Sequence, residues 1–128
     1  MNFTLTKSER ISRKLIIDRL FMEGKSFVAY PLRVVYIANV ENQDVPLAML
    51  VSVSKKRFKR AVKRNLIKRR VREAFRLNKH GLKLPQEIQN VAVAFIYLST
   101  DLADFSVINR KMEEINLQIN RRLCSENS

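Results

Sequence analysis

The chain has 128 residues, a length typical of one domain, and 46% of them are hydrophobic, which excludes a compositionally disordered protein. Its 25 lysine and arginine residues against 12 acidic residues give a net charge of +13, which indicates a polyanionic partner, nucleic acid before an anionic membrane surface. A single cysteine, Cys124, excludes an intrachain disulfide, and a single histidine, His80, excludes a two-histidine metal site.

The first predicted element is a helix over residues 12–23. Ser12 is the expected N-cap, and Gly24 is expected in the left-handed conformation beyond the C-terminus. A capping box at residues 6–9 is an alternative start. The apolar side of this helix consists of Ile16, Ile17, Leu20 and Phe21.

Three strand candidates follow the first helix. They cover residues 27–30, 32–40 and 47–53, and the second is rich in β-branched and aromatic residues. The segment 41–44 is a polar turn between the second and third strands. This turn predicts that the second and third strands form a hairpin.

A basic helix is predicted over residues 60–78, with Gly81 beyond its end as a stop signal. Twelve basic residues lie between positions 55 and 76, where Glu73 is the only acid. Apolar residues recur in this run at the spacing of one helical stripe: Ile67, Val71, Ala74 and Phe75. The stripe predicts that one face packs on a core while the other faces display cations. Because a merely solvated face normally interleaves both signs, this pattern favours polyanion binding.

The last two elements are a strand over residues 90–98 and a helix over residues 104–123. The strand is the most apolar stretch of the chain, which predicts a central position with both faces buried. The helix carries a core-facing stripe at Phe105, Ile108, Met112, Ile115 and Ile119. The element order predicts one α+β domain over residues 1–128, an α-β-β-β-α-β-α sandwich with helices packed on a sheet.

Two segments resemble a known family. Ser52-Val53-Ser54-Lys55-Lys56, together with the run from Ala61 to Arg76, is similar to the signature of the bacterial ribonuclease P protein subunit. The resemblance implies a four-stranded sheet with a left-handed β-α-β crossover, although such connections are right-handed by default. It also implies a ribonucleoprotein whose RNA hydrolyses the phosphodiester bond between the 5′ leader and the tRNA. The protein would bind this RNA with its basic helix, and the leader with a cleft between its first helix and the sheet.

The resemblance assigns no catalytic residue to the protein and implies two binding sets. The RNA-binding set is Lys55, Lys56, Arg57, Lys59, Arg60, Lys63, Arg64, Asn65, Lys68, Arg69 and Arg72. The leader-binding cleft is implied at Ile17, Phe21, Tyr36 and Ser54. The family's Arg-Asn-Arg motif falls on Arg64, Asn65 and Leu66, so leucine replaces the second arginine, and Arg70 is one turn away to offset the missing charge. From the residues alone, Phe21 and Tyr36 are equally compatible with ordinary core positions, and Asn65 with a solvated one.

The resemblance implies that the protein alone binds no cofactor and no metal, whereas the RNA–protein holoenzyme requires Mg²⁺. The expected partners are ribonuclease P RNA and the precursor tRNA leader, with no obligatory protein partner. No signal peptide and no apolar run of about 20 residues is present, so we expect a cytoplasmic protein without membrane association.

Three other functions compete with the ribonuclease P subunit. A structured-RNA-binding protein of ribosomal type would need only the charge. A self-sufficient nuclease would need a histidine and carboxylate constellation that the sequence lacks. A membrane-surface protein would need a wider apolar face on the basic helix.

Overall fold

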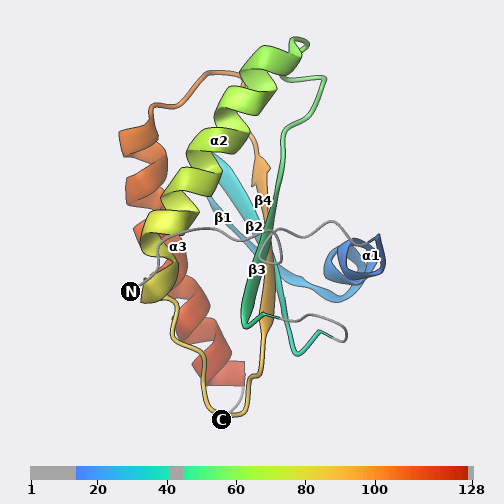
Figure 1. The fold of residues 1–128 in the computed structure, drawn as a ribbon, viewed down its shortest axis with the longest axis vertical. Helices are drawn as coiled ribbons and strands as arrows, with labels where there is room; N and C mark the ends of the chain where they lie inside the picture. Colours follow the sequence, from blue (N-terminus) through green and yellow to red (C-terminus); the bar gives the residue numbers. More distant parts are fainter. Residues whose placement is uncertain (1–13, 41–44, 127–128) are drawn as a thin grey trace.

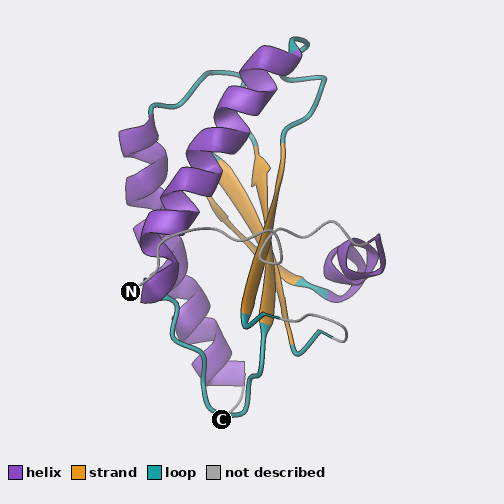
Figure 2. Ribbon diagram, in the orientation of Figure 1, coloured by secondary structure: helices purple, strands orange, loops and turns teal. Residues whose placement is uncertain are grey.

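A computed structural model of the chain describes residues 14–40 and 45–126, which form one sheet with helices on both of its faces (Figures 1 and 2). The elements are α1 (Lys14–Glu23), β1 (Lys25–Ala29), β2 (Leu32–Ala38), β3 (Leu47–Ser52), α2 (Ala61–Asn78), a short 3₁₀ turn (Lys79–Gly81), β4 (Val91–Tyr97) and α3 (Phe105–Glu126). Each predicted element is present, with its ends shifted by a few residues. The predicted cap at Ser12, the capping box at 6–9 and the polar turn at 41–44 lie outside the described residues.

The sheet has the strand order β1-β2-β4-β3. β4 pairs antiparallel with β2 and parallel with β3, and β1 pairs antiparallel with β2. The predicted hairpin of the second and third strands is therefore wrong. β2 and β3 do run in opposite directions, but β4 lies between them because its apolar residues gain burial from a neighbour on each side. The central position predicted for β4 is confirmed.

The hairpin of this sheet is instead formed by β1 and β2. Ala29 pairs with Leu32, so only Tyr30 and Pro31 connect the two strands, and the peptide bond between them is cis. The Pro31 carbonyl accepts a hydrogen bond of 2.8 Å from the Leu98 amide, which joins the turn to the end of β4.

The chain passes from β3 through α2 to the parallel neighbour β4, which makes the β-α-β crossover. In Figure 1, β3 is the strand nearest the viewer, α2 lies to the left of the sheet, and β4 lies behind β3. This arrangement is left-handed. The fold class is confirmed as α+β, with three α-helices and a four-stranded mixed sheet within residues 14–40 and 45–126.

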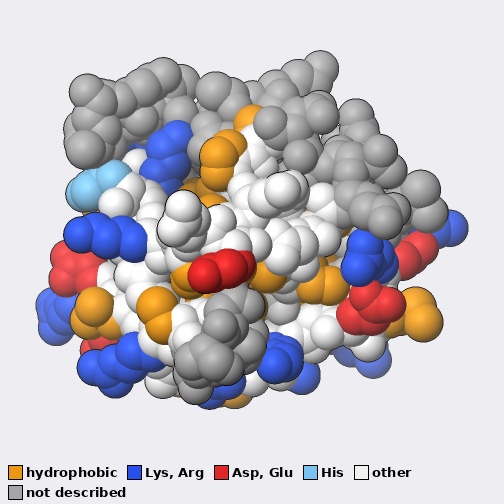
Figure 3. All heavy atoms as spheres, turned by 90° about the horizontal axis from the view of Figure 1, so that it is seen from below, with side chains coloured by type: hydrophobic (Ala, Val, Ile, Leu, Met, Phe, Trp, Pro, Cys, Tyr) orange, Lys and Arg blue, Asp and Glu red, His pale blue; other side chains and the backbone are white. Residues whose placement is uncertain are grey.

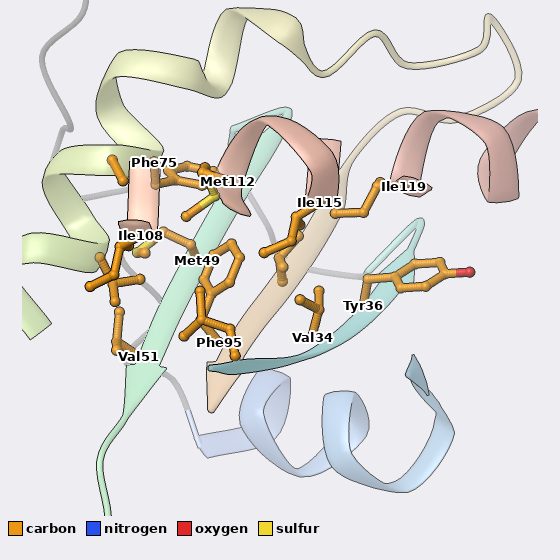
Figure 4. Packing of buried hydrophobic residues seen from close by; sticks show 14 of the residues in the cluster. Val34, Tyr36, Met49, Val51, Phe75, Phe95, Ile108, Met112, Ile115 and Ile119 are labelled. Carbon is orange, nitrogen blue, oxygen red and sulfur yellow. The ribbon is translucent and has the colours of Figure 1, made fainter. Parts of the chain in front are cut away.

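The sheet separates two clusters of buried side chains. One face packs against α2 and α3, and its cluster includes all four residues of the predicted α2 stripe together with Phe95 and Tyr97. Figure 4 shows the interdigitation of this cluster, with Met112, Ile115 and Ile119 of α3 placed over the sheet. The other face packs against α1 through Ile16 and Leu20, which contact a smaller cluster at Val35, Ala92 and Ala94.

Gly24 connects α1 to β1 in a way that the sequence did not predict. No glycine among the described residues has a positive φ, so the expected left-handed conformation is wrong. A Cβ atom on Gly24 would instead lie 2.2 Å from the Leu20 carbonyl oxygen and 2.8 Å from a methyl group of Val35. Glycine is therefore required here because α1 ends in close contact with β2.

Candidate nucleic-acid interface

Residues 54–60, in the connection between β3 and α2, are here named the basic loop. Ser54 organises its first turn: the Ser54 carbonyl accepts hydrogen bonds from the Arg57 and Phe58 amides, and its Oγ accepts one from the Lys56 amide at 3.1 Å. Phe58 is buried, and its ring lies 6.0 Å from the ring of Tyr97. The loop therefore has an anchored backbone and exposes five cations: Lys55, Lys56, Arg57, Lys59 and Arg60.

Helix α2 continues this cationic surface. Its buried stripe points toward the sheet, so the other members of the predicted RNA-binding set lie on the remaining sides of the helix. Lys63, Asn65 and Arg69 are exposed, while Arg64, Lys68 and Arg72 are half-buried. The structure thus brings the eleven residues of the predicted set onto one loop and the helix that follows it.

The N-terminus of α2 is also free of negative charge. Its N-cap, Arg60, has an extended backbone and makes no side-chain capping bond, and the first turn contains no acidic residue. The positive end of the helix dipole therefore adds to the charge of the surrounding lysines and arginines instead of being compensated by a carboxylate. Such a helix end favours an anionic ligand.

Glu73, the one acid in the basic segment, is paired within its own helix. The Arg76 Nε donates a hydrogen bond of 3.1 Å to Glu73 Oε2, and a second contact joins Arg76 Nη2 to Oε1. The hydrogen bond from Arg76 holds the pKa of the Glu73 carboxyl below its ordinary value. Glu73 therefore stays ionised and largely cancels the charge of Arg76, which lies outside the predicted RNA-binding set.

The leucine at position 66 has a neighbour that the sequence did not single out. Val62 precedes it by one turn and is 78% exposed, and Leu66 is half-buried, so the two form an apolar strip between the cations. Arg70, the expected substitute for the missing arginine, donates from Nη1 to the Ala103 carbonyl at 2.6 Å. Its guanidinium is therefore fixed against the connection from β4 to α3.

The four residues assigned to the leader-binding cleft do not lie together. Tyr36 is 2% exposed, packs 6.2 Å from the Phe27 ring and belongs to the cluster under α2 and α3 (Figure 4). Ile17 and Phe21 are on α1, across the sheet. The assignment of Tyr36 to a cleft beside α1 is therefore wrong: strand alternation places Tyr36 with Val34, on the core side.

A different set of residues lies open on the α1 side of the sheet. Strand register places four side chains in one row across it: Val28, Arg33, Ile96 and Ser52. α1 covers the adjacent row, which contains Val35 and Ala94, and leaves this one largely uncovered. Val28 is 60% exposed, Arg33 and Ser52 are exposed, and Ile96 is half-buried. We name these four residues the open row.

The open row ends where the basic loop begins. Ser52 is the last residue of β3, and Ser54 starts the loop. Tyr30 is 60% exposed and follows β1, the edge strand farthest from β3. Phe21, on α1, is 48% exposed. Arg33 donates from Nη2 to Ser26 Oγ at 3.4 Å, which keeps the guanidinium over the sheet. The strand pairing that creates this row is not readable from the sequence, which is why Arg33 was missed.

The opposite end of the molecule has a mixed surface. Figure 3 shows it from below, with Lys and Arg side chains interspersed with Asp and Glu and with small hydrophobic areas. An open apolar pocket of about 380 Å³ lies between the start of β3 and the segment after α2, lined by Val45, Pro46, Leu47, Lys79, His80, Leu82 and Leu84. The concentration of one charge sign is therefore a feature of the basic loop and α2.

A mixed sheet with a left-handed crossover, whose crossover helix and preceding loop carry a dense cationic surface, defines a basic RNA-binding α+β protein. The sequence matches the Ribonuclease P family over residues 5–120. The chain therefore belongs to the family of ribonuclease P protein components. This membership makes it an RNA-binding subunit with a role in tRNA processing by an endoribonuclease complex, and makes ribonuclease P RNA its partner.

Relatives and solved structures agree with this assignment. The ribonuclease P protein component of Porphyromonas gingivalis strain ATCC 33277 is 51% identical over 119 residues, which cover 91% of this chain and 87% of the relative. The structure of the Staphylococcus aureus RNase P protein has a TM-score of 0.66 and 27% identity, and covers 88% of this chain and 95% of the other. The RNase P protein from Thermotoga maritima, at 24% identity, shares the fold with a TM-score of 0.65, over 86% and 96% of the two chains.

Among the described residues, no helix is both long and apolar enough to cross a membrane.

Proposed function

We propose that the protein binds ribonuclease P RNA through the basic loop and α2 and holds the 5′ leader of precursor tRNA along the open row. The observation that carries this proposal is the concentration of cations on one loop and helix, next to an uncovered part of the sheet. The RNA carries out the hydrolysis of the phosphodiester bond in this proposal, and the protein contributes binding and orientation.

The basic loop and α2 suit a folded RNA backbone. Arginine guanidinium groups bind phosphates through two parallel hydrogen bonds, and lysines add point charges on flexible stems. An anchored loop and a packed helix hold these groups in fixed positions relative to one another. Each neutralised phosphate releases counterions, so RNA affinity should fall steeply as the salt concentration rises.

The open row suits an unpaired strand. Arg33 offers a cation at its centre, Ser52 offers a hydroxyl, and the exposed rings of Tyr30 and Phe21 are available for bases to stack on. Stacking on an aromatic ring contributes about 1–3 kcal/mol per base and tolerates any sequence. This tolerance is useful because leaders differ between precursors. Ile17, half-buried on α1, and Ser54, whose hydroxyl caps the loop, flank this surface in a supporting role.

The Mg²⁺ requirement of the holoenzyme belongs, in this proposal, to the RNA. Within residues 14–40 and 45–126, no three or more histidine, cysteine, aspartate or glutamate side chains come together to hold a metal ion. In this proposal, the cationic and aromatic residues described above contact phosphates and bases directly. The cytoplasmic location and the lack of an obligatory protein partner stay predictions from the sequence.

The test is cleavage of precursor tRNA by a bacterial ribonuclease P RNA at low Mg²⁺, with and without this protein, on long-leader and leaderless substrates. We expect strong stimulation that is larger for the long-leader substrate. Salt-sensitive RNA binding without stimulation would instead identify a general structured-RNA-binding protein. Cleavage by the protein without RNA would contradict the assignment of catalysis to the RNA.

Replacing Arg33 by alanine should selectively weaken leader recognition. We expect roughly a fivefold to tenfold weaker affinity of the holoenzyme for a long-leader precursor, because one charge-assisted phosphate contact is lost. Affinity for a leaderless precursor and for the RNA subunit should be unchanged. Fluorescence-based binding titrations with both substrates measure this difference.

Arg110→Ala is the matched control, since it removes an exposed arginine from α3, outside the open row. Arg33→Lys should restore part of the affinity because it keeps the charge. Equal losses with long-leader and leaderless substrates would show that Arg33 does not contact the leader.

A further inference from the structure

The basic loop brings five cations together within six residues, from Lys55 to Arg60, and no acidic residue lies among them. Like charges this close repel one another, so the loop needs contacts that hold its backbone in place. Ser54 provides them at the start of the loop, and the buried ring of Phe58 provides them in its middle. A third contact is needed where the loop enters α2.

Arg64 supplies this third contact. Its Nη1 donates hydrogen bonds to two successive carbonyl oxygens of the loop, that of Phe58 at 2.7 Å and that of Lys59 at 2.8 Å. Arg64 is half-buried and is the fourth residue of α2, one helical turn after the N-cap Arg60. One guanidinium nitrogen thus bridges the rigid helix and the loop backbone.

We propose that Arg64 is a positioning residue, which holds the basic loop in the shape that binds RNA, and that its main contribution to RNA affinity comes through the cations of that loop. This inference rests on the proposed RNA-binding function. It changes the role of the one arginine of the Arg-Asn-Arg motif that this chain retains, since Leu66 occupies the second arginine position.

The energetic reason lies in the two carbonyl oxygens. Without Arg64, the partly buried carbonyl of Phe58 and that of Lys59 lose their donor, and repulsion between the lysines and arginines is free to spread the loop. A loop that samples many shapes must be ordered when the RNA binds, and where it stays disordered the phosphate contacts of several loop cations are lost together. Removing Arg64 should therefore lower RNA affinity by more than the removal of one charge would.

The first test compares Arg64→Ala with Arg69→Ala in binding to ribonuclease P RNA over a range of salt concentrations. Arg69 is an exposed cation on the same helix and makes no described contact with the loop, so it reports the loss of one charge. We expect Arg64→Ala to weaken binding at least fivefold more than Arg69→Ala. The slope of log affinity against log salt is negative, and in Arg64→Ala its magnitude should decrease by more than the value of about 0.7–0.9 that one phosphate contact gives.

The second test is a double-mutant cycle between Arg64→Ala and the pair Lys55→Ala with Lys56→Ala. If Arg64 acts through the loop, the lysine substitutions should cost much less affinity in the Arg64→Ala background than in the wild type. Additive losses would overturn the inference and indicate a direct phosphate contact by Arg64. A wild-type protein that does not bind the RNA at all would contradict the proposed function instead.

The third test needs no RNA. Trypsin cleaves after lysine and arginine, so the rate of cutting between residues 55 and 60 reports how often the loop opens. We expect roughly tenfold faster cutting there in Arg64→Ala than in Arg69→Ala, with near-equal thermal unfolding midpoints for the two variants. Equal cutting rates in the two variants would overturn the inference, and a large fall in the midpoint of Arg64→Ala would assign it a role in global stability.

Discussion

Replacing Lys55, Lys56 and Arg57 together by alanine should weaken binding of ribonuclease P RNA by about 10²- to 10³-fold at moderate salt. These three side chains are exposed on the turn that Ser54 organises, so their loss removes charge without removing buried contacts. The magnitude of the negative slope of log affinity against log salt should decrease by about 2–3, because each phosphate contact contributes about 0.7–0.9. Filter-binding titrations at several salt concentrations measure both quantities.

A matched control removes the same number of charges elsewhere. Lys83, Arg110 and Arg121 are exposed cations after α2 and along α3, away from the basic loop. Their triple alanine variant should keep its RNA affinity within a few-fold of the wild type. If both triple variants lost affinity equally, net charge alone would explain binding, and the basic loop would not be the RNA-binding surface.

Replacing Phe95 by alanine should cost about 3–5 kcal/mol of the free energy of unfolding. Phe95 is fully buried at the centre of β4, and its ring packs edge-on against Phe75 of α2 with 5.7 Å between the ring centroids. The substitution leaves a cavity between the sheet and the helix that carries the cations. The total free energy of unfolding of a small domain is about 5–15 kcal/mol, so this substitution removes a large part of the stability. Urea titrations monitored by circular dichroism measure the free energy of unfolding of both proteins.

Two further variants make this result interpretable. Phe95→Leu removes less volume and should give a smaller loss in the same direction, which keeps the test valid if the alanine variant does not fold. Leu117→Ala changes a residue of α3 that is 59% exposed and should alter stability by less than about 0.5 kcal/mol. A loss below 1 kcal/mol for Phe95→Ala would contradict the packing described here.

Local periodicity predicted the elements and much of the cationic surface. The stripe at Ile67, Val71, Ala74 and Phe75 is fully buried, as expected from a spacing that places all four on one side of a helix. The apolar run of β4 correctly predicted a central strand. Both patterns depend only on residues that are close together along the chain. They can therefore be recognised without knowing which elements are neighbours in space.

The errors concern relations between segments. A polar turn showed that the chain reverses between β2 and β3, but not that β4 is inserted between them. Alternation along a strand places Tyr36 on the same face as Val34, but it does not indicate which side of the sheet that face covers. For the same reason Arg33 was missed, because its place in the open row depends on the register of three strand pairs.

The short distance along the chain between Ser52 and Ser54 gives the protein the properties of a ruler. The last side chain of the open row and the first of the basic loop belong to one strand and its continuation, so the separation between the two surfaces is set by covalent geometry and by the sheet. The row crosses four strands, a width of about 14 Å. Under the proposed function, an RNA fixed on the loop would therefore meet the leader at a constant distance from the scissile bond, and leaders too short to cross the sheet would gain only part of the stimulation.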